Sequence, residues 1–143
     1  MTTSLDPAAR ADLLARARTA ALGSYSPYSR FRVGAAVLTT RGLFLGTNVE
    51  NASYGLCLCA ERAALAAAIT AGATEIQAIA VACIDARHDA GANELMPCGA
   101  CRQWFVELAP RAEIHVAGVE RSFTAGELLA SAFSLQPRAD AAP

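Results

Sequence analysis

The sequence predicts one α/β domain in which helices cover both faces of a mixed five-stranded β-sheet, a three-layer α/β/α sandwich. Helical and extended segments follow one another in the order αββαβαββα, which is typical of layered α/β domains. Residues 76–84 form a continuous apolar run of strand length, which indicates a strand buried on both faces. The 143 residues, 54% of them hydrophobic, suffice for one core. We expect a single domain over 1–137 and a flexible tail over 138–143.

The first half of the chain is predicted as helix, hairpin and helix. Asp6 before Pro7 is typical of a helix start, and Gly23 marks its end. Arg41 and Gly42 form a tight turn between two antiparallel strands. A stretch rich in Ala and Leu then predicts a second helix. The four elements are residues 7–22, 31–39, 43–48 and 59–70.

The second half adds a helix, two short strands and a last helix after the buried strand. Pro97 precedes the third helix, and Gly118 separates the two strands. Thr124 with Glu127 three residues later is a capping box that begins the last helix. These elements are residues 98–108, 113–117, 121–123 and 124–129.

Charge and hydropathy exclude several classes of protein. The formal net charge is −1, and the twelve basic residues are all Arg and are scattered along the chain. No basic cluster matches a nucleic-acid backbone or a membrane surface, and every apolar run is too short to span a bilayer. Residues 1–10 lack the basic-then-apolar order of a secretion signal. We therefore expect a cytoplasmic protein with no nucleic-acid or membrane partner.

Cysteine usage predicts a metal site. The five cysteines are an odd number without a secretion signal, which disfavours a disulfide framework. Cys98 and Cys101 share one face of a helical first turn, and Cys59 begins another helix. Helix N-termini favour thiolates, and three sulfur ligands suit Zn²⁺ with a fourth position left for water. Glu61, two residues from Cys59, can reach that water without binding the metal, as a proton shuttle requires.

Three thiolates around Zn²⁺ sum to a charge of −1, which weakens the metal as a Lewis acid. Hydrogen bonds from cations to the sulfurs would offset part of this loss. Arg62 and Arg102 directly follow the two cysteine segments and are the candidates. The alternative for each is a loop cap or a plain surface residue.

Other interpretations of the cysteines stay open. The pair Cys98 and Cys101 can be a redox motif, and Cys57 can complete a structural four-cysteine site. Cys83 within the apolar strand is expected to be a small core residue. His88 and His115 are not expected to be ligands.

The cysteine and glutamate spacing matches the signature of zinc nucleobase deaminases, in which zinc-bound hydroxide attacks C4 of cytosine and a Glu moves protons; the spacing alone does not establish that mechanism. Over most of its length the sequence resembles the small homotetrameric cytidine deaminases. The matching segments are residues 24–36 (SYSPYSRFRVGAA), 46–56 (GTNVENASYGL), 59–64 (CAERAA) and 97–103 (PCGACRQ).

The resemblance implies hydrolytic deamination of cytidine and 2′-deoxycytidine to the corresponding uridines, in pyrimidine salvage, with one zinc per subunit. It implies that Arg62 hydrogen-bonds the zinc-bound sulfurs. The ligands would be Cys59, Cys98 and Cys101, with Glu61 as proton carrier. The implied substrate-binding residues are Phe31 and Val33 at the pyrimidine, Asn48 and Glu50 at the sugar 3′-hydroxyl, Ala60, and Tyr54 and Phe133 lent to a neighbouring subunit's site.

Two other functions remain in view. One is deamination of another aminopyrimidine nucleoside of the blasticidin type, and the other is a zinc-stabilised binding module without catalysis. A deaminase of polynucleotides would need a basic channel with stacking aromatics, and aromatic residues are only 6% of this chain. The apolar helix around Ala63 to Ile69 favours a tight homo-oligomer.

Overall fold

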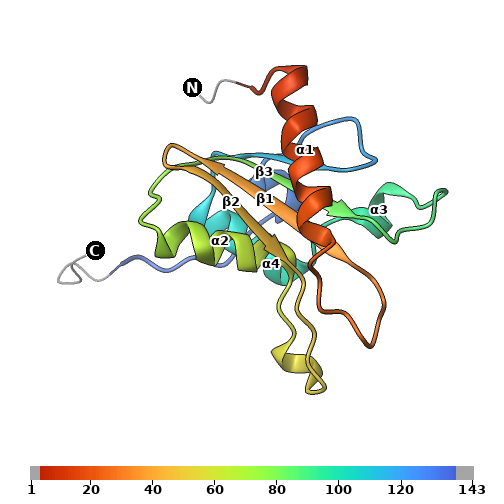
Figure 1. Ribbon diagram of the computed structural model, residues 1–143. Helices are drawn as coiled ribbons and strands as arrows, with labels where there is room; N and C mark the ends of the chain where they lie inside the picture. Colours follow the sequence, from red (N-terminus) through yellow and green to blue (C-terminus); the bar gives the residue numbers. More distant parts are fainter. Residues whose placement is uncertain (1–3, 138–143) are drawn as a thin grey trace.

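A computed structural model describes residues 4–137 and contains one four-stranded mixed sheet (Figure 1). The strands lie in the order β2-β1-β3-β4. β1 is antiparallel to both β2 and β3, and β3 is parallel to β4. Their bounds are Val33–Thr39, Gly42–Thr47, Ile76–Cys83 and Glu113–Val116.

Helices cover both faces of this sheet, which confirms the predicted layers (Figure 1). Helix α1, Pro7–Ala21, packs on one face, where Asp6 caps its start and accepts hydrogen bonds from two backbone N–H groups. Helices α2, Ala60–Thr70, and α4, Gly99–Leu108, pack on the other. The short helix α5, Ala125–Leu128, joins the same core and begins with the predicted capping box.

The two faces differ in side-chain size because residues alternate along each strand. The face under α1 carries small residues, among them Ala36, Ala80 and Ala82. A side chain at Gly34 would place its Cβ 1.9 Å from the backbone oxygen of Ala17. The small residues therefore let α1 lie close against the sheet. The opposite face carries larger branched residues: Val37, Ile79, Val81 and Ile114.

The predicted fifth strand, residues 121–123, is wrong. Only Phe123 pairs with the sheet, through two hydrogen bonds to Ile114 of 2.8 and 2.9 Å. Gly118 turns the chain with φ at +89°, and Thr124 immediately caps α5. Between them the chain bends at Glu120 and Arg121, so the pairing does not extend beyond one bridge.

Two short helices were not predicted: η1, Tyr54–Leu56, a 3-10 turn, and α3, Ala92–Leu95. The predicted helix starts at Cys59 and Cys98 are shifted by one residue, because both cysteines are N-caps with extended backbone. Within the described residues, no helix is long and apolar enough to cross a membrane. The expected tail over 138–143 lies outside the described residues.

Candidate active site

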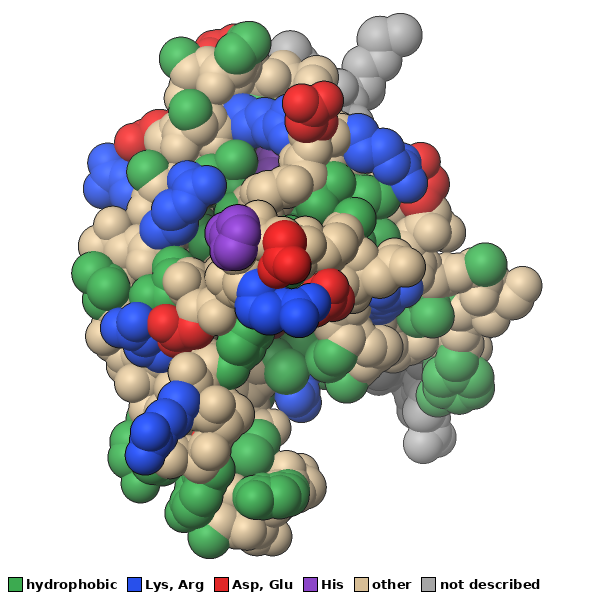
Figure 2. Space-filling model, turned by 90° about the vertical axis from the view of Figure 1, so that its right-hand side faces the viewer, with side chains coloured by type: hydrophobic (Ala, Val, Ile, Leu, Met, Phe, Trp, Pro, Cys, Tyr) green, Lys and Arg blue, Asp and Glu red, His purple; other side chains and the backbone are tan. Residues whose placement is uncertain are grey.

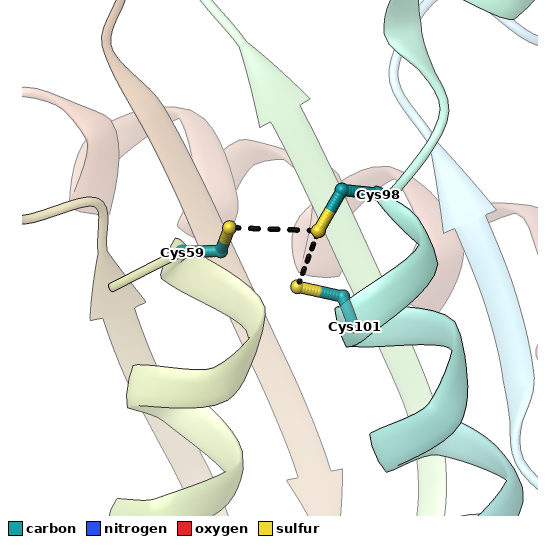
Figure 3. A group of neighbouring side chains, drawn as sticks. All are labelled: Cys59, Cys98 and Cys101. Carbon is teal, nitrogen blue, oxygen red and sulfur yellow. Dashed lines mark hydrogen bonds between the residues drawn. The ribbon is translucent and has the colours of Figure 1, made fainter. Parts of the chain in front are cut away.

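Three cysteine sulfurs converge where α2 and α4 begin. The Sγ atoms of Cys59 and Cys98 are 3.7 Å apart, and those of Cys98 and Cys101 are 3.5 Å apart. All three atoms lie within 4.8 Å of one another. Figure 3 shows the side chains from the two helices pointing toward one another. Neither N-cap sulfur caps its own helix, so both remain free to bind a metal ion.

The surroundings of this cluster favour the thiolate of Cys59. The Cys101 thiol, together with Arg62, lowers the pKa of Cys59 to about 5, while the same contact raises the pKa of Cys101. Arg62 donates from Nη2 to the Cys59 Sγ at 3.6 Å and to the Cys57 carbonyl at 3.4 Å. A cation beside these sulfurs offsets the negative charge that bound thiolates would accumulate.

The residues present fit a zinc ion. Three soft sulfur atoms at this spacing form the ligand set that zinc prefers, and three protein ligands leave one position for water. Among the described residues, the buried Nε of Arg62 has no hydrogen-bond partner, although the guanidinium donates to the Cys59 sulfur. The net negative charge of a three-thiolate zinc centre would balance this partly buried cation.

Glu61 lies in the first turn of α2 beside this cluster and outside its set of possible ligands. Its side chain is only 4% exposed, and burial raises the pKa of this carboxyl to about 7, with a further contribution from the Cys59 sulfur. A carboxyl that exchanges its proton near neutral pH is suited to accept and deliver protons.

A cavity of about 270 Å³ opens onto the Cys59 and Cys98 side chains and Glu61. Eight of the residues predicted from the sequence line it. These are Phe31, Val33, Asn48, Glu50, Cys59, Ala60, Glu61 and Cys98. Segments far apart in the sequence therefore line one cavity. Its wall carries two of the cysteines and the buried Glu61 carboxyl, together with the polar side chains of Asn48 and Glu50.

Asn48 holds the backbone that leads into β1. Its Nδ2 donates to the Phe31 carbonyl at 2.8 Å, and its Oδ1 accepts from the Val33 N–H at 2.9 Å and from Ser24. The described contacts use one of the two N–H bonds of the amide. The other remains available as a donor in the cavity.

Glu50 organises the neighbouring turn. Its carboxylate accepts hydrogen bonds from the backbone N–H groups of Tyr28 and Ser29, at 2.9 and 3.2 Å, and from the Ser29 hydroxyl. The Ser29 hydroxyl is the main cause that lowers the pKa of this carboxyl. Glu50 is therefore ionised at neutral pH and can accept a further hydrogen bond from a hydroxyl group.

Tyr54 and Phe133 do not reach the cavity of their own chain. Their side chains are 74% and 69% exposed. Tyr54 begins the 3-10 turn η1 in the loop that projects from the bottom of Figure 1, and hydrophobic side chains gather on the lowest part of Figure 2. Phe133 lies beside α4, where its carbonyl accepts a hydrogen bond from Gln103.

Arg102 was expected to contact the sulfurs, and its described hydrogen bonds go elsewhere. Its Nε donates to the Pro97 carbonyl at 2.8 Å, and its Nη1 donates to the Leu128 carbonyl at 2.9 Å. Arg102 thus ties the segment before Cys98 to the end of α5.

Sequence reasoning missed several lining residues. Cys83 was expected in the core, yet it lies opposite Val33 at the end of β3 and lines the cavity. The other lining residues that were not predicted are Val49, Cys57, Leu58, Val81, Glu94, Leu95 and Met96. The apolar pattern could place Cys83 on the same face as Val81, but no motif marks the irregular segment before Pro97.

These features define a class of protein. An α/β sandwich with metal-binding cysteines at two helix starts, and a buried carboxyl beside them that is not a ligand, is the arrangement of a zinc-dependent deaminase.

Comparisons with known proteins agree with this class. The family model of the cytidine and deoxycytidylate deaminase zinc-binding region matches residues 8–117. A cytidine deaminase of Halalkalibacterium halodurans is 41% identical over 133 residues, which cover 90% of this chain and 96% of that protein. The crystal structure of cytidine deaminase from Burkholderia pseudomallei has a TM-score of 0.76 and 46% identity, covering 86% of this chain and 98% of that one.

A cytidine deaminase of Mycobacterium tuberculosis is 44% identical over 124 residues, or 86% of this chain and 88% of that protein. The chain belongs to the cytidine and deoxycytidylate deaminase family.

Proposed function

We propose that this protein catalyses the hydrolytic deamination of cytidine and 2′-deoxycytidine to uridine and 2′-deoxyuridine, with release of ammonia. One observation carries the proposal: the buried Glu61 carboxyl adjoins a cluster of three cysteine sulfurs in a cavity of about 270 Å³. The family membership of the chain supports the same activity.

Cys59, Cys98 and Cys101 would hold a zinc ion, and that ion would supply the Lewis acid that makes water a nucleophile near neutral pH. Glu61 takes the proton that water loses as its oxygen bonds to C4 of the pyrimidine. Glu61 delivers this proton to the ring nitrogen. It then takes the second proton from the new C4 hydroxyl and delivers it to the amino group, so that the C4–N bond breaks, C4=O forms and ammonia leaves. A pKa of about 7 serves both steps, since the carboxyl must accept and release protons in one cycle.

The charges around the cavity favour a nucleoside over a nucleotide. Among the described residues that line it are three carboxylates, of Glu50, Glu61 and Glu94, and no Arg. A 5′-phosphate would meet no cation here and would be repelled by the acidic side chains. The family includes deoxycytidylate deaminases, so this charge distribution narrows the substrate to the uncharged nucleoside.

The lining residues fit the two halves of a nucleoside. Phe31 and Val33 offer apolar surface for the pyrimidine ring, and Ala60 is a small residue beside the sulfurs. Asn48 has a spare N–H bond and Glu50 a charged acceptor, which together suit the sugar 3′-hydroxyl. Both ribose and deoxyribose carry that hydroxyl, so both nucleosides are substrates.

The protein assembles as a homo-oligomer, and we take the homotetramer as its form. The exposed Tyr54, Leu56 and Phe133 support this, because large apolar side chains at 69–74% exposure favour burial against a second copy. Tyr54 and Phe133 would then complete a neighbour's cavity. Deamination of free nucleosides belongs to pyrimidine salvage, and reduced metal-binding cysteines suit the cytoplasm.

Zinc analysis together with an absorbance assay tests the proposal. The purified protein should contain one zinc per chain and convert cytidine and 2′-deoxycytidine, while deoxycytidine 5′-monophosphate should be a poor substrate. Blasticidin S tests the alternative aminopyrimidine substrate. The absence of zinc, or turnover of blasticidin S without turnover of cytidine, would refute the proposal. Bound zinc without any turnover would indicate a binding module.

A further inference from the structure

Residues 31–33, which end at the first residue of β1, lie beside the cavity. Phe31 and Val33 line it, whereas Arg32 between them does not. Phe31 precedes the first residue of β1, so regular strand pairing does not fix its backbone. Asn48 holds this stretch through the Phe31 carbonyl and the Val33 N–H, as described above.

Asp85 holds the same stretch through Arg32. The Arg32 backbone N–H donates to Oδ2 of Asp85 at 2.8 Å. The guanidinium donates from Nε to the same oxygen at 2.9 Å and from Nη2 to Oδ1 at 2.7 Å. The Arg32 carbonyl accepts from the Ile84 N–H at 3.1 Å. Every backbone donor and acceptor from the Phe31 carbonyl to the Val33 N–H is therefore occupied.

We propose that the Arg32–Asp85 ion pair positions Phe31 and Val33 against the pyrimidine ring of the substrate. This inference rests on the proposed function. The two-pronged contact of guanidinium and carboxylate fixes direction as well as distance. Asp85 follows β3 two residues after Cys83, which also lines the cavity, so the pair joins two of its walls.

The pair acts through position more than through stability. Its side chains are 43% and 25% exposed, and ion pairs that water reaches contribute little to the free energy of folding. Hydrogen bonds from Arg32 lower the pKa of Asp85 to about 2, so the pair stays ionised at neutral pH. Without the pair, the fold and the metal site should be unchanged, whereas the Phe31 ring should no longer be held in one position against the cavity.

Steady-state kinetics of the zinc-loaded Asp85→Ala protein test this. We expect KM for cytidine to rise about five- to tenfold while kcat stays within about twofold, because a ring that binds substrate and transition state alike affects KM alone. Arg32→Lys keeps the positive charge but loses the two-pronged contact with the Asp85 carboxylate, so KM should rise by a smaller factor. Asp12→Ala is the matched control, since it removes the partner of Arg16 in another exposed pair on α1.

An Asp85→Ala protein with the KM of the wild type would overturn the inference, whether or not its melting temperature changes. If that variant does not fold, the Arg32→Met protein provides the test. This change keeps the hydrogen bond from the Arg32 backbone N–H to Asp85 and removes only the guanidinium contacts. The same rise in KM is then expected, and an unchanged KM would overturn the inference. A wild-type protein inactive on every nucleoside would overturn the proposed function instead.

Discussion

The two faces of the sheet carry different tasks. The face under α1 is lined with alanines and closes tightly on the helix. The face under α2 and α4 carries larger residues, and at one end it opens into the cavity with the cysteine sulfurs. On the second face α2 also approaches the sheet closely, since a Cβ at Gly46 would lie 2.4 Å from the backbone oxygen of Ala60. The two faces therefore differ in that only the second leaves room for chemistry at one end.

Among the described residues, each face also buries one carboxyl or imidazole side chain. Glu61 is 4% exposed beside the sulfurs, and His115 is 2% exposed under α1. His115 lies next to Ala80 in the parallel pairing of β3 and β4, and within residues 4–137 neither ring nitrogen has a hydrogen-bond partner. Burial raises the pKa of Glu61 and lowers that of His115, because in both it disfavours the charged form. Only Glu61 adjoins a cavity in which its proton can be used.

Replacement of Glu61 should have the largest effect. Glu61→Ala removes the only buried carboxyl beside the sulfurs among the described residues. We expect kcat for cytidine to fall about 10⁴-fold, the upper end of the usual range, because one group both removes and delivers protons. Zinc content should remain at one per chain, since Glu61 is not a ligand. Metal analysis and steady-state kinetics on the same preparation check both statements.

Near-normal turnover by the Glu61→Ala protein would contradict the assigned chemistry. Glu61→Gln is the matched variant, because it keeps the volume of the side chain and loses the carboxyl group that accepts and delivers protons. It should be as inactive as Glu61→Ala.

Replacement of Arg62 should have the next largest effect, on the same face. Arg62→Gln removes the cation that donates to the Cys59 Sγ. We expect activity or zinc affinity to fall about 10- to 100-fold, the usual loss when a partner of a metal ligand is removed. Competition with a zinc chelator and assays at saturating zinc separate the two effects. Arg121→Gln, which breaks an exposed pair with Glu127, should change neither.

The metal site was predictable because its signals are local. Cys59 and Glu61 lie two residues apart, and Cys98 and Cys101 lie on one helical turn, so local spacing defines each half of the site. The fold brings Cys59 to Cys98, 39 residues later in the sequence. The helices and the buried strand were predictable for the same reason, since periodicity and capping act over a few residues.

The remaining parts depend on contacts across the chain. The fifth strand failed because a turn and a cap, each correctly expected, left only Phe123 to pair. Arg102 resembles Arg62 in its place after a cysteine, but the Pro97 and Leu128 carbonyls determine where its guanidinium points. Arg32 and Asp85 lie 53 positions apart in the sequence, and no local sequence pattern predicts their contact.

A third prediction tests whether the functional face is complete within one chain. Tyr54→Ala should lower kcat/KM for cytidine about tenfold, because the ring would complete a neighbour's cavity. Tyr54 is 74% exposed in its own chain, so its loss should change the stability of an isolated subunit by no more than about 0.5 kcal/mol. Kinetics, denaturation and light scattering are compared with those of Tyr54→Phe, which keeps the ring. Full activity of a Tyr54→Ala monomer would refute the shared cavity.

The smallest effect is expected on the α1 face, where His115 should affect stability and not catalysis. Burial lowers the pKa of His115 in the folded protein. In the unfolded chain the same imidazole binds a proton near pH 6.5, at which the folded protein binds less. The unfolded state thus binds more protons, and stability falls as the pH decreases from 7 to 5, by up to about 1.4 kcal/mol per unit. Arg10 on α1 adds to this shift, and Glu113, 3.4 Å away, opposes it.

The change His115→Leu should flatten this dependence and leave kcat and KM at neutral pH unchanged. Urea denaturation at pH 7, 6 and 5 measures it, and the quantity compared is the difference in slope between wild type and variant. Glu61 titrates in the same range with the opposite sign, since its raised pKa lets the folded state bind the additional proton, but it contributes equally to both proteins.

The control His88→Leu removes an exposed histidine and should keep the wild-type slope. Equal slopes in the wild type and the His115→Leu protein would show that the α1 face does not resist protonation. A loss of activity at neutral pH would show that the two faces are coupled rather than separate in their tasks.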